Sequence, residues 1–286
     1  MKISQHLAAN GSKTRERRLW LERLPSLVDE LLRRWNLARH VELNGEAATC
    51  SYVMAVVAAN GTPAVLKIGM PPMEAAHEIA GLSFWNGDPT VRLLETDNQL
   101  GAMLLERCRP GTTLRALEDH EQDAVIGGLL HRLWRSPSTP NPFRHLSVLM
   151  EHWSNETLAQ SQQWFDSGLT TEGLRLFREL SHTAPQEVLL ATDLHAGNVL
   201  RAEREPWLVI DPKPFLGDPA FDATQHLFNC WPRLRSNPDR TIRKFADQLG
   251  VDHERVRSWT FARIAAEPRD DWTTNEQTEL ARRIAP

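Results

Sequence analysis

A β-hairpin followed by a single helix restricts the fold of the first hundred residues more than any other feature. Asn60-Gly61 separates two β-rich runs and suits the positive φ angles of a tight turn. Strands are expected at 51–58, 63–68, 90–94 and 101–105, and a helix at 74–85. Hairpins make antiparallel neighbours, and only one helix is available for a crossover. This order therefore excludes a doubly wound parallel sheet.

The pattern of strands stops near residue 107, and mostly helical segments follow. We therefore expect an α+β protein with an N-terminal domain of residues 1–106 and a C-terminal helical domain of residues 107–286. The first domain should begin with an amphipathic helix over residues 13–35, which Pro25 breaks. A short β island should interrupt the second domain, with strands at 187–190, 199–200 and 207–210.

Composition and charge exclude several classes of protein. The 286 residues are 41% hydrophobic and 24% charged, which is typical of a soluble globular chain. The net charge of −4 supplies no bulk positive field for nucleic acid. The longest nearly apolar run, 54–59, is far shorter than the roughly 20 residues of a membrane-spanning helix, and the first residues lack a secretory signal. We expect a cytoplasmic protein without nucleic-acid or membrane partners.

Two strands of the β island each deliver polar side chains at one end. Asp193 and Asn198 bound an Asp-x-x-x-x-Asn loop, and Asp211 follows the next strand. A hairpin here would gather two carboxylates and an amide oxygen, ligands that suit Mg²⁺. Kinases place an Asp at the acceptor hydroxyl, and an Asn five residues later and an Asp after the next strand at the metal. Asp270 and Asn275 have the same spacing in a strandless segment, so the strand context carries the prediction.

The first domain supplies a cation for nucleotide phosphates. Lys67 ends a hairpin strand among apolar neighbours, like the Val-Ala-Ile-Lys pattern of kinases. Glu74 and Glu78 lie one turn apart on the following helix, and we choose Glu78 as the partner of Lys67. The alternative is a lysine at a sheet edge, with its stem along apolar surface. Residues 44–51, with a single glycine, would form the turn over the phosphates.

Four motifs carry a family resemblance: Lys67, the connector Leu104-Leu105-Glu106-Arg107-Cys108, the loop from Asp193 to Asn198, and Ile210-Asp211-Pro212. Together they resemble the aminoglycoside phosphotransferase family of the protein-kinase-like fold. Its streptomycin 6-phosphotransferase branch is similar at 91–94, 104–107, 210–214 and 217–222. The likeness covers roughly residues 50–231, and nothing after residue 237 is matched.

The resemblance implies a two-lobe fold, with an antiparallel sheet in the N-lobe and a mainly helical C-lobe. It implies transfer of a phosphoryl group from ATP, with Mg²⁺, to a hydroxyl of a small cationic molecule, a streptomycin-type aminoglycoside first, and inactivation of that antibiotic. We expect a monomer or weak dimer. The implied roles are Asp193 as catalytic base, Asn198 and Asp211 as Mg²⁺ ligands, Lys67 on the α/β-phosphates, Glu78 as its ion-pair partner, and backbone groups from Glu106 to Cys108 on adenine.

One departure from the family concerns the start of the catalytic loop. Relatives usually have His-Gly-Asp where this chain has Ala191-Thr192-Asp193. Because Thr192 can hydrogen-bond locally, we expect altered loop geometry rather than loss of activity. His195 is interpreted as a loop-packing residue, since Asp193 already serves as the base.

Other functions stay open from the residues alone. His195 with Asp193 and Asp211 suits a hydrolase metal cluster, which leaves Lys67 unexplained. A second alternative keeps the phosphoryl transfer but has a metabolite as the acceptor, such as a sugar, a choline-like alcohol or homoserine. A third is a relative that binds nucleotide without turnover. Asp218 and Asp222 suit a cationic substrate, although we favour a turn former and a helix cap, respectively.

Overall fold

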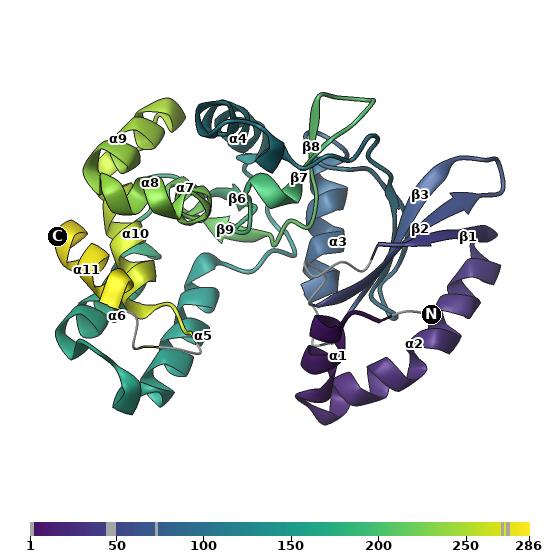
Figure 1. Ribbon diagram of the computed structural model, residues 1–286, viewed down its shortest axis with the longest axis horizontal. Coiled ribbons are helices and arrows are strands. Elements are labelled where there is room, and N and C mark those ends of the chain that lie inside the picture. The colour runs from purple at the N-terminus through teal and green to yellow at the C-terminus, as the bar shows by residue number, and fades with distance from the viewer. Residues whose placement is uncertain (1–2, 44–49, 72–73, 270–271, 273–274) are drawn as a thin grey trace. The chain divides into compact units, whose positions relative to one another are not determined.

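The chain folds as two compact units (Figure 1). The computed structural model describes residues 3–43, 50–71, 74–269, 272 and 275–286. The first unit comprises Met1–Thr112 with Leu200–Ile210, and the second comprises Thr113–Val199 with Asp211–Pro286. The turn expected over the phosphates lies largely at 44–49, outside the described residues. No described helix is long and apolar enough to cross a bilayer.

A five-stranded antiparallel sheet forms the centre of the first unit, with strand order β1-β2-β3-β5-β4. The strands are β1 (Leu37–Glu42), β2 (Ser51–Ala58), β3 (Pro63–Gly69), β4 (Leu93–Asp97) and β5 (Ala102–Glu106). The expected hairpin is β2 and β3, in which Gly61 takes a φ of +82° and Asn60 stays outside the left-handed region. The order strand, strand, helix, strand, strand is confirmed. The edge strand β1 was not predicted, because its alternation of apolar and polar residues is weak.

Helices cover both faces of this sheet (Figure 1). They are α1 (Gln5–Ser12), α2 (Arg15–Arg34) and α3 (Glu74–Trp85). Successive side chains of a strand point to opposite faces. Leu66 and Ile68 therefore join the core beneath α1 and α2, whereas Val65 packs in the core beneath α3. The same alternation places Lys67 on the α3 face.

Pro25 does not end the leading helix, contrary to the sequence prediction. α2 continues through it from Arg15 to Arg34. A proline inside a helix costs about 3 kcal/mol. Leu24, Val28 and Leu31 on the same helix are fully buried, and each such side chain contributes about 1.5–3 kcal/mol. Their packing outweighs the cost of the proline.

The second unit is mainly helical, as expected. Its helices are α4 (Asp119–Leu133), α5 (Leu146–Ala159), α6 (Ser167–Leu180), α7 (Pro219–Asn229), α8 (Trp231–Ser236), α9 (Pro238–Leu249), α10 (His253–Ala266) and α11 (Asn275–Ile284). Its core contains contacting rings from α5, α6, α7 and α10: Trp153, Phe177, Phe221 and Trp259.

The β island consists of two short strand pairs. β6 (Val188–Leu190) pairs antiparallel with β9 (Phe215–Gly217), and β7 (Val199–Arg201) pairs with β8 (Trp207–Val209). The hairpin of β7 and β8 matches the prediction, whereas β9 was not predicted. Between β6 and β7 lies the loop that carries Asp193 and Asn198.

Candidate active site

The loop between β6 and β7 orients the side chain of Asn198. This residue ends a short 3₁₀ helix (Ala196–Asn198), and its Nδ2 donates to the backbone carbonyl of Asp193 at 3.0 Å. Since the amide nitrogen faces that carbonyl, the amide oxygen Oδ1 points the other way. An amide oxygen so directed suits a hard cation such as Mg²⁺.

Asp211 and the residues after it are tied to the start of the same loop. Lys213 N donates to the carbonyl of Ala191 at 2.8 Å, and Thr192 Oγ1 donates to the carbonyl of Lys213 at 2.6 Å. His195 experiences the charges of both Asp193 and Asp211. The fold thus brings the two predicted carboxylates close to the same imidazole.

The carboxylate of Asp193 is held by groups that the sequence did not single out. Gln225 Nε2 donates to Oδ1 at 2.8 Å, and Lys213 Nζ lies 3.0 Å from Oδ2. His195 Nε2 is 3.9 Å from Oδ1, beyond hydrogen-bonding distance. Asp193 therefore keeps a fixed orientation between an amide donor and a cation.

Thr192 occupies the backbone conformation for which the family's glycine is suited. Its φ is +49°, in the left-handed region that is costly for a β-branched residue. The carboxylate of Asp222 accepts its backbone N–H at 2.7 Å and that of Ala191 at 3.0 Å. The hydroxyl donates to the carbonyl of Lys213, 21 residues later in the chain, and not to a sequence neighbour as predicted. Three hydrogen bonds at residues 191 and 192 thus compensate for the missing glycine.

Thr192→Gly and Thr192→Val should separate these contributions to stability. Both variants lose the hydroxyl, but only valine keeps a branched side chain at positive φ, which costs about 1–2 kcal/mol. We expect Thr192→Gly to unfold within about 1 kcal/mol of wild type and Thr192→Val to be about 2 kcal/mol less stable. Urea denaturation measures both, and equal stabilities would contradict the proposed strain at Thr192.

Asp222 is a fully buried anchor of this loop and not the helix cap predicted from sequence. The N-cap of α7 is Asp218, whose Oδ1 accepts from Ala220 N at 3.0 Å. Burial raises the pKa of Asp222 from 3.8 to about 6, against the lowering effect of hydrogen bonds from Ala191, Trp134 and Thr192. Asp218 and Asp222 therefore both have structural roles, as favoured from the sequence, although the role of Asp222 differs from the one predicted.

The raised pKa of Asp222 predicts a pH dependence of stability. Because the folded state has the higher pKa, the stabilising contribution is full below 3.8 and is lost as the pH rises through about 6. This difference corresponds to about 3 kcal/mol. Asp222→Asn is neutral throughout. We expect the stability of wild type relative to this variant to fall between about pH 4 and pH 7, and a constant difference in urea denaturation would contradict the shift.

His195 acts as a packing residue of the loop. Its Nδ1 accepts from the N–H of Gly197 at 3.0 Å. Burial lowers the pKa of the imidazole, and the nearby cations Arg115 and Lys213 lower it further. Within the described residues, His195 does not form a three-ligand metal group with Asp193 and Asp211. A hydrolase metal centre is therefore disfavoured.

Lys67 and Glu78 form the predicted ion pair inside the first unit. Lys67 Nζ lies 2.7 Å from each carboxylate oxygen of Glu78, and the two residues are only 7% and 6% exposed. The side chain of Glu74 lies outside the described set. A buried pair with this geometry excludes the alternative of a lysine along an exposed edge.

The connector after β5 is fixed by an arginine from the β7–β8 turn. Arg204 donates to both carboxylate oxygens of Glu106, at 2.9 Å from Nε and 2.8 Å from a terminal nitrogen. Partial burial acts to raise the pKa of Glu106, but the hydrogen bonds from Arg204 and the Arg92 backbone and the charges of both arginines together outweigh it, and the pKa is lowered. Burial raises the pKa of the Cys108 thiol to about 12. The side chains of Glu106 and Cys108 are thus structural.

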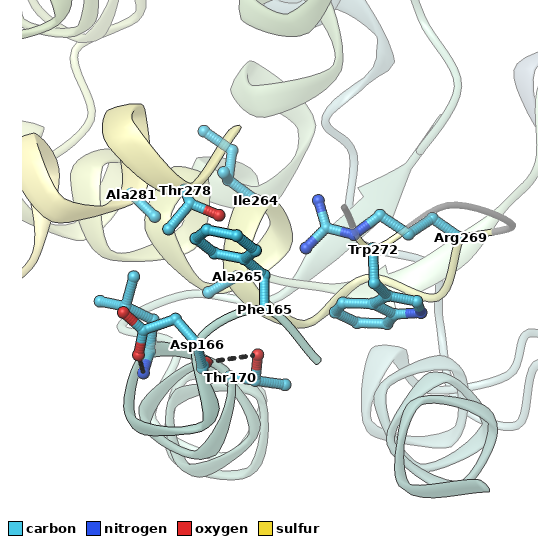
Figure 2. Close-up of a pocket in the computed structure, with 10 residues that line it drawn as sticks. Phe165, Asp166, Thr170, Ile264, Ala265, Arg269, Trp272, Thr278 and Ala281 are labelled. Carbon is cyan, nitrogen blue, oxygen red and sulfur yellow. Dashed lines mark hydrogen bonds between the residues drawn. The ribbon is translucent and has the colours of Figure 1, made fainter. Parts of the chain in front are cut away.

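Two other features of the second unit are separate from this loop. Possible metal-ligand atoms of Asp123, His226 and Cys230 lie within 4.8 Å of one another. Arg233 donates to both carboxylate oxygens of Asp123, so its guanidinium already provides the positive charge that a metal ion would supply. A small pocket lies among α6, α10 and α11 (Figure 2). Phe165, Arg269 and Trp272 line it, and no residue of the catalytic loop does.

Sequence reasoning missed Gln225, Lys213 and Arg204 as functional residues. Lys213 follows Asp211 by two positions, inside the segment 210–214 that resembles the family, but its spacing predicts no role. Gln225 and Arg204 contact residues 32 and 98 positions away in the chain. No local spacing signals such contacts.

Solved structures share this fold. Choline kinase LicA from Streptococcus pneumoniae aligns with a TM-score of 0.66 over 91% of this chain and 98% of its own, at 12% identity. A choline/ethanolamine kinase family protein from Mesorhizobium loti aligns with a TM-score of 0.58 over 90% and 93%, at 15% identity. The chain is therefore a protein with the protein-kinase-like fold, an antiparallel N-lobe and a helical C-lobe.

The sequence narrows this class to one family. Residues 34–269 match the profile of the aminoglycoside/hydroxyurea antibiotic resistance kinases. Streptomycin 6-kinase from Streptomyces glaucescens is 38% identical over 92% of this chain and 89% of its own length, and hydroxyurea phosphotransferase from Kitasatospora aureofaciens is 36% identical over 92% and 76%. The chain belongs to the aminoglycoside/hydroxyurea antibiotic resistance kinase family, and the predicted resemblance is confirmed.

Proposed function

We propose that this protein transfers the γ-phosphoryl group of ATP to a hydroxyl of a streptomycin-type aminoglycoside, and so inactivates the antibiotic. The observation that carries the proposal is the geometry of the catalytic loop. The Asp193 carbonyl orients the side chain of Asn198, and hydrogen bonds that join residues 191 and 192 to Lys213 hold the start of the loop to the segment after Asp211. Relatives at 37–38% identity are streptomycin 6-kinases. LicA, which shares the fold, has been solved in complex with AMP.

The donor set of the loop fits Mg²⁺. Asp211 supplies a carboxylate and Asn198 an amide oxygen, both hard ligands that this ion prefers. When bound, Mg²⁺ neutralises charge on the nucleotide phosphates. Asn198 and Asp211 are the residues that would hold it.

The protein's own residues account for the remaining steps. Asp193 accepts a hydrogen bond from the acceptor hydroxyl and orients it for in-line attack. Lys67, held extended by Glu78, contacts the α- and β-phosphates, and backbone groups of Glu106 to Cys108 contact adenine. As the hydroxyl oxygen bonds to the γ-phosphorus, the bond to ADP breaks and the proton passes to Asp193.

Hydroxyurea is a second candidate acceptor. One relative, at 36% identity, is a hydroxyurea phosphotransferase. Asp218 and Asp222, the two acidic residues singled out for a cationic substrate, are committed to Trp259, Arg255 and the loop backbone. They do not supply negative charge to a cationic acceptor, which leaves a small neutral molecule in contention.

The deciding experiment incubates purified protein with Mg·ATP and single acceptors, read by mass spectrometry. The panel contains streptomycin, hydroxyurea, other aminoglycosides, choline, homoserine and sugars. We expect streptomycin heavier by one phosphoryl group. Phosphorylation of hydroxyurea or a metabolite alone would reassign the acceptor, and ATP binding without any product would support a non-catalytic protein.

A further inference from the structure

A hydrogen-bonded series of three side chains runs from Arg263 on α10 through Gln225 to Asp193. We propose that Gln225, itself held by Arg263, is a positioning residue that fixes the carboxylate of Asp193 for phosphoryl transfer. The inference rests on the proposed function and extends the site into the C-terminal region, where no motif was recognised. Arg263, Gln225 and Asp193 all belong to the second unit.

The chemistry of its neighbours determines how the Gln225 amide is oriented. A guanidinium only donates hydrogen bonds and a carboxylate only accepts them. Arg263 donates to Gln225 Oε1 at 3.0 Å, so Nε2 must face Asp193, to which it donates at 2.8 Å. The reversed amide would place a nitrogen against the guanidinium and an oxygen against the carboxylate. Arg263 therefore selects the donor that Asp193 receives.

Arg263 is itself immobilised by its surroundings. It is 5% exposed and donates to Thr224 Oγ1 at 2.7 Å and to Glu267 Oε2 at 2.7 Å. Its guanidinium lies 4.7–5.4 Å from the centroids of three rings: Phe228, Phe221 and Trp153. A planar cation held on its faces and edges is a rigid support for the amide.

Asp193 needs such a support because its terminal torsion is intrinsically broad. Lys213 contacts the other oxygen, but its side chain is 41% exposed and long. Gln225 projects from the regular helix α7 and is braced by a buried cation. Of the two contacts, the glutamine therefore fixes the plane of the carboxylate, and misplacement by about 1 Å can cost 10²-fold in rate.

Gln225→Glu tests the proposal because it separates positioning from packing. The glutamate has nearly the same shape and keeps its contact with Arg263, but it presents a carboxylate instead of a donor to Asp193. We expect kcat to fall about 10- to 100-fold, with the KM for ATP changed less than about twofold and the thermal unfolding midpoint retained. Gln122→Glu on α4, whose amide donates to the Leu117 carbonyl, is the matched control and should keep wild-type kcat.

A second pair of variants tests the role of Arg263. Gln225→Met is neutral, so it replaces the glutamate if the added charge unfolds the protein, and it should lose about tenfold in kcat. Arg263→Lys cannot reproduce the planar fork and should also lower kcat. If Arg263 acts through Gln225, the kcat of the double variant Gln225→Met, Arg263→Lys should equal that of Gln225→Met within about twofold.

Each outcome decides the proposal. Wild-type kcat in Gln225→Glu or Gln225→Met, or fully additive losses in the double variant, would overturn it while leaving the phosphotransferase assignment intact. A wild-type protein that phosphorylates no acceptor would instead refute the proposed function, and this positioning role with it.

Discussion

Asp193→Ala should lower kcat for the phosphorylated acceptor by at least about 10²-fold, because general-base and positioning effects act in the transition state. Affinity for ATP should stay nearly intact, because the variant removes a negative charge and keeps a positive one. The cation is Lys213, whose Nζ lies 3.0 Å from Oδ2 of Asp193 in the wild-type protein. Steady-state kinetics gives kcat and KM, and titration with a non-hydrolysable ATP analogue gives nucleotide affinity. Full activity would refute the assignment of the base.

Asp193→Asn is the matched control for this prediction. The asparagine oxygen can still accept from Gln225, but its amide nitrogen then faces the Lys213 ammonium. Because the Lys213 side chain is 41% exposed, it can turn to solvent, and we expect the loop to keep its geometry. It cannot take the acceptor proton, so kcat should fall nearly as far as in the alanine variant. Activity close to wild type in Asp193→Asn would mean that Asp193 orients the loop without acting on the acceptor hydroxyl.

Local spacing made half of the site predictable. Asp193 and Asn198 lie within one short loop, and Asp211 follows the next strand, so their convergence follows from one hairpin. Lys67 and Glu78 are 11 residues apart on adjacent elements. Their pairing follows from strand alternation and the helix that comes next.

The other half depends on how distant helices pack. Asp222 looks like a helix cap because acidic residues are common in a first turn, yet its carboxylate binds backbone 30 residues earlier in the chain. Arg263 reaches Gln225 from another helix, 38 residues away. Such contacts are set by the aromatic core around Trp259, which periodicity places in the interior without fixing its neighbours.

Lys67→Met should abolish most phosphoryl transfer and also destabilise the first unit. Removing one partner of a buried ion pair leaves an uncompensated charge and costs about 3–5 kcal/mol. Glu78 is 6% exposed, so water cannot replace the lost ammonium. We therefore expect weaker ATP binding, loss of rate and a lower unfolding free energy together, measured by nucleotide titration, kinetics and urea denaturation.

The double variant Lys67→Met, Glu78→Leu separates the two effects. Replacing a buried ion pair by apolar side chains of similar volume is often neutral or stabilising, so the double variant should recover the stability lost in Lys67→Met. It cannot recover the cation proposed for the α- and β-phosphates, so ATP affinity and kcat should stay low. A stable double variant with wild-type kinetics would show that the pair only holds α3 against the sheet, and that the nucleotide phosphates are neutralised by other groups.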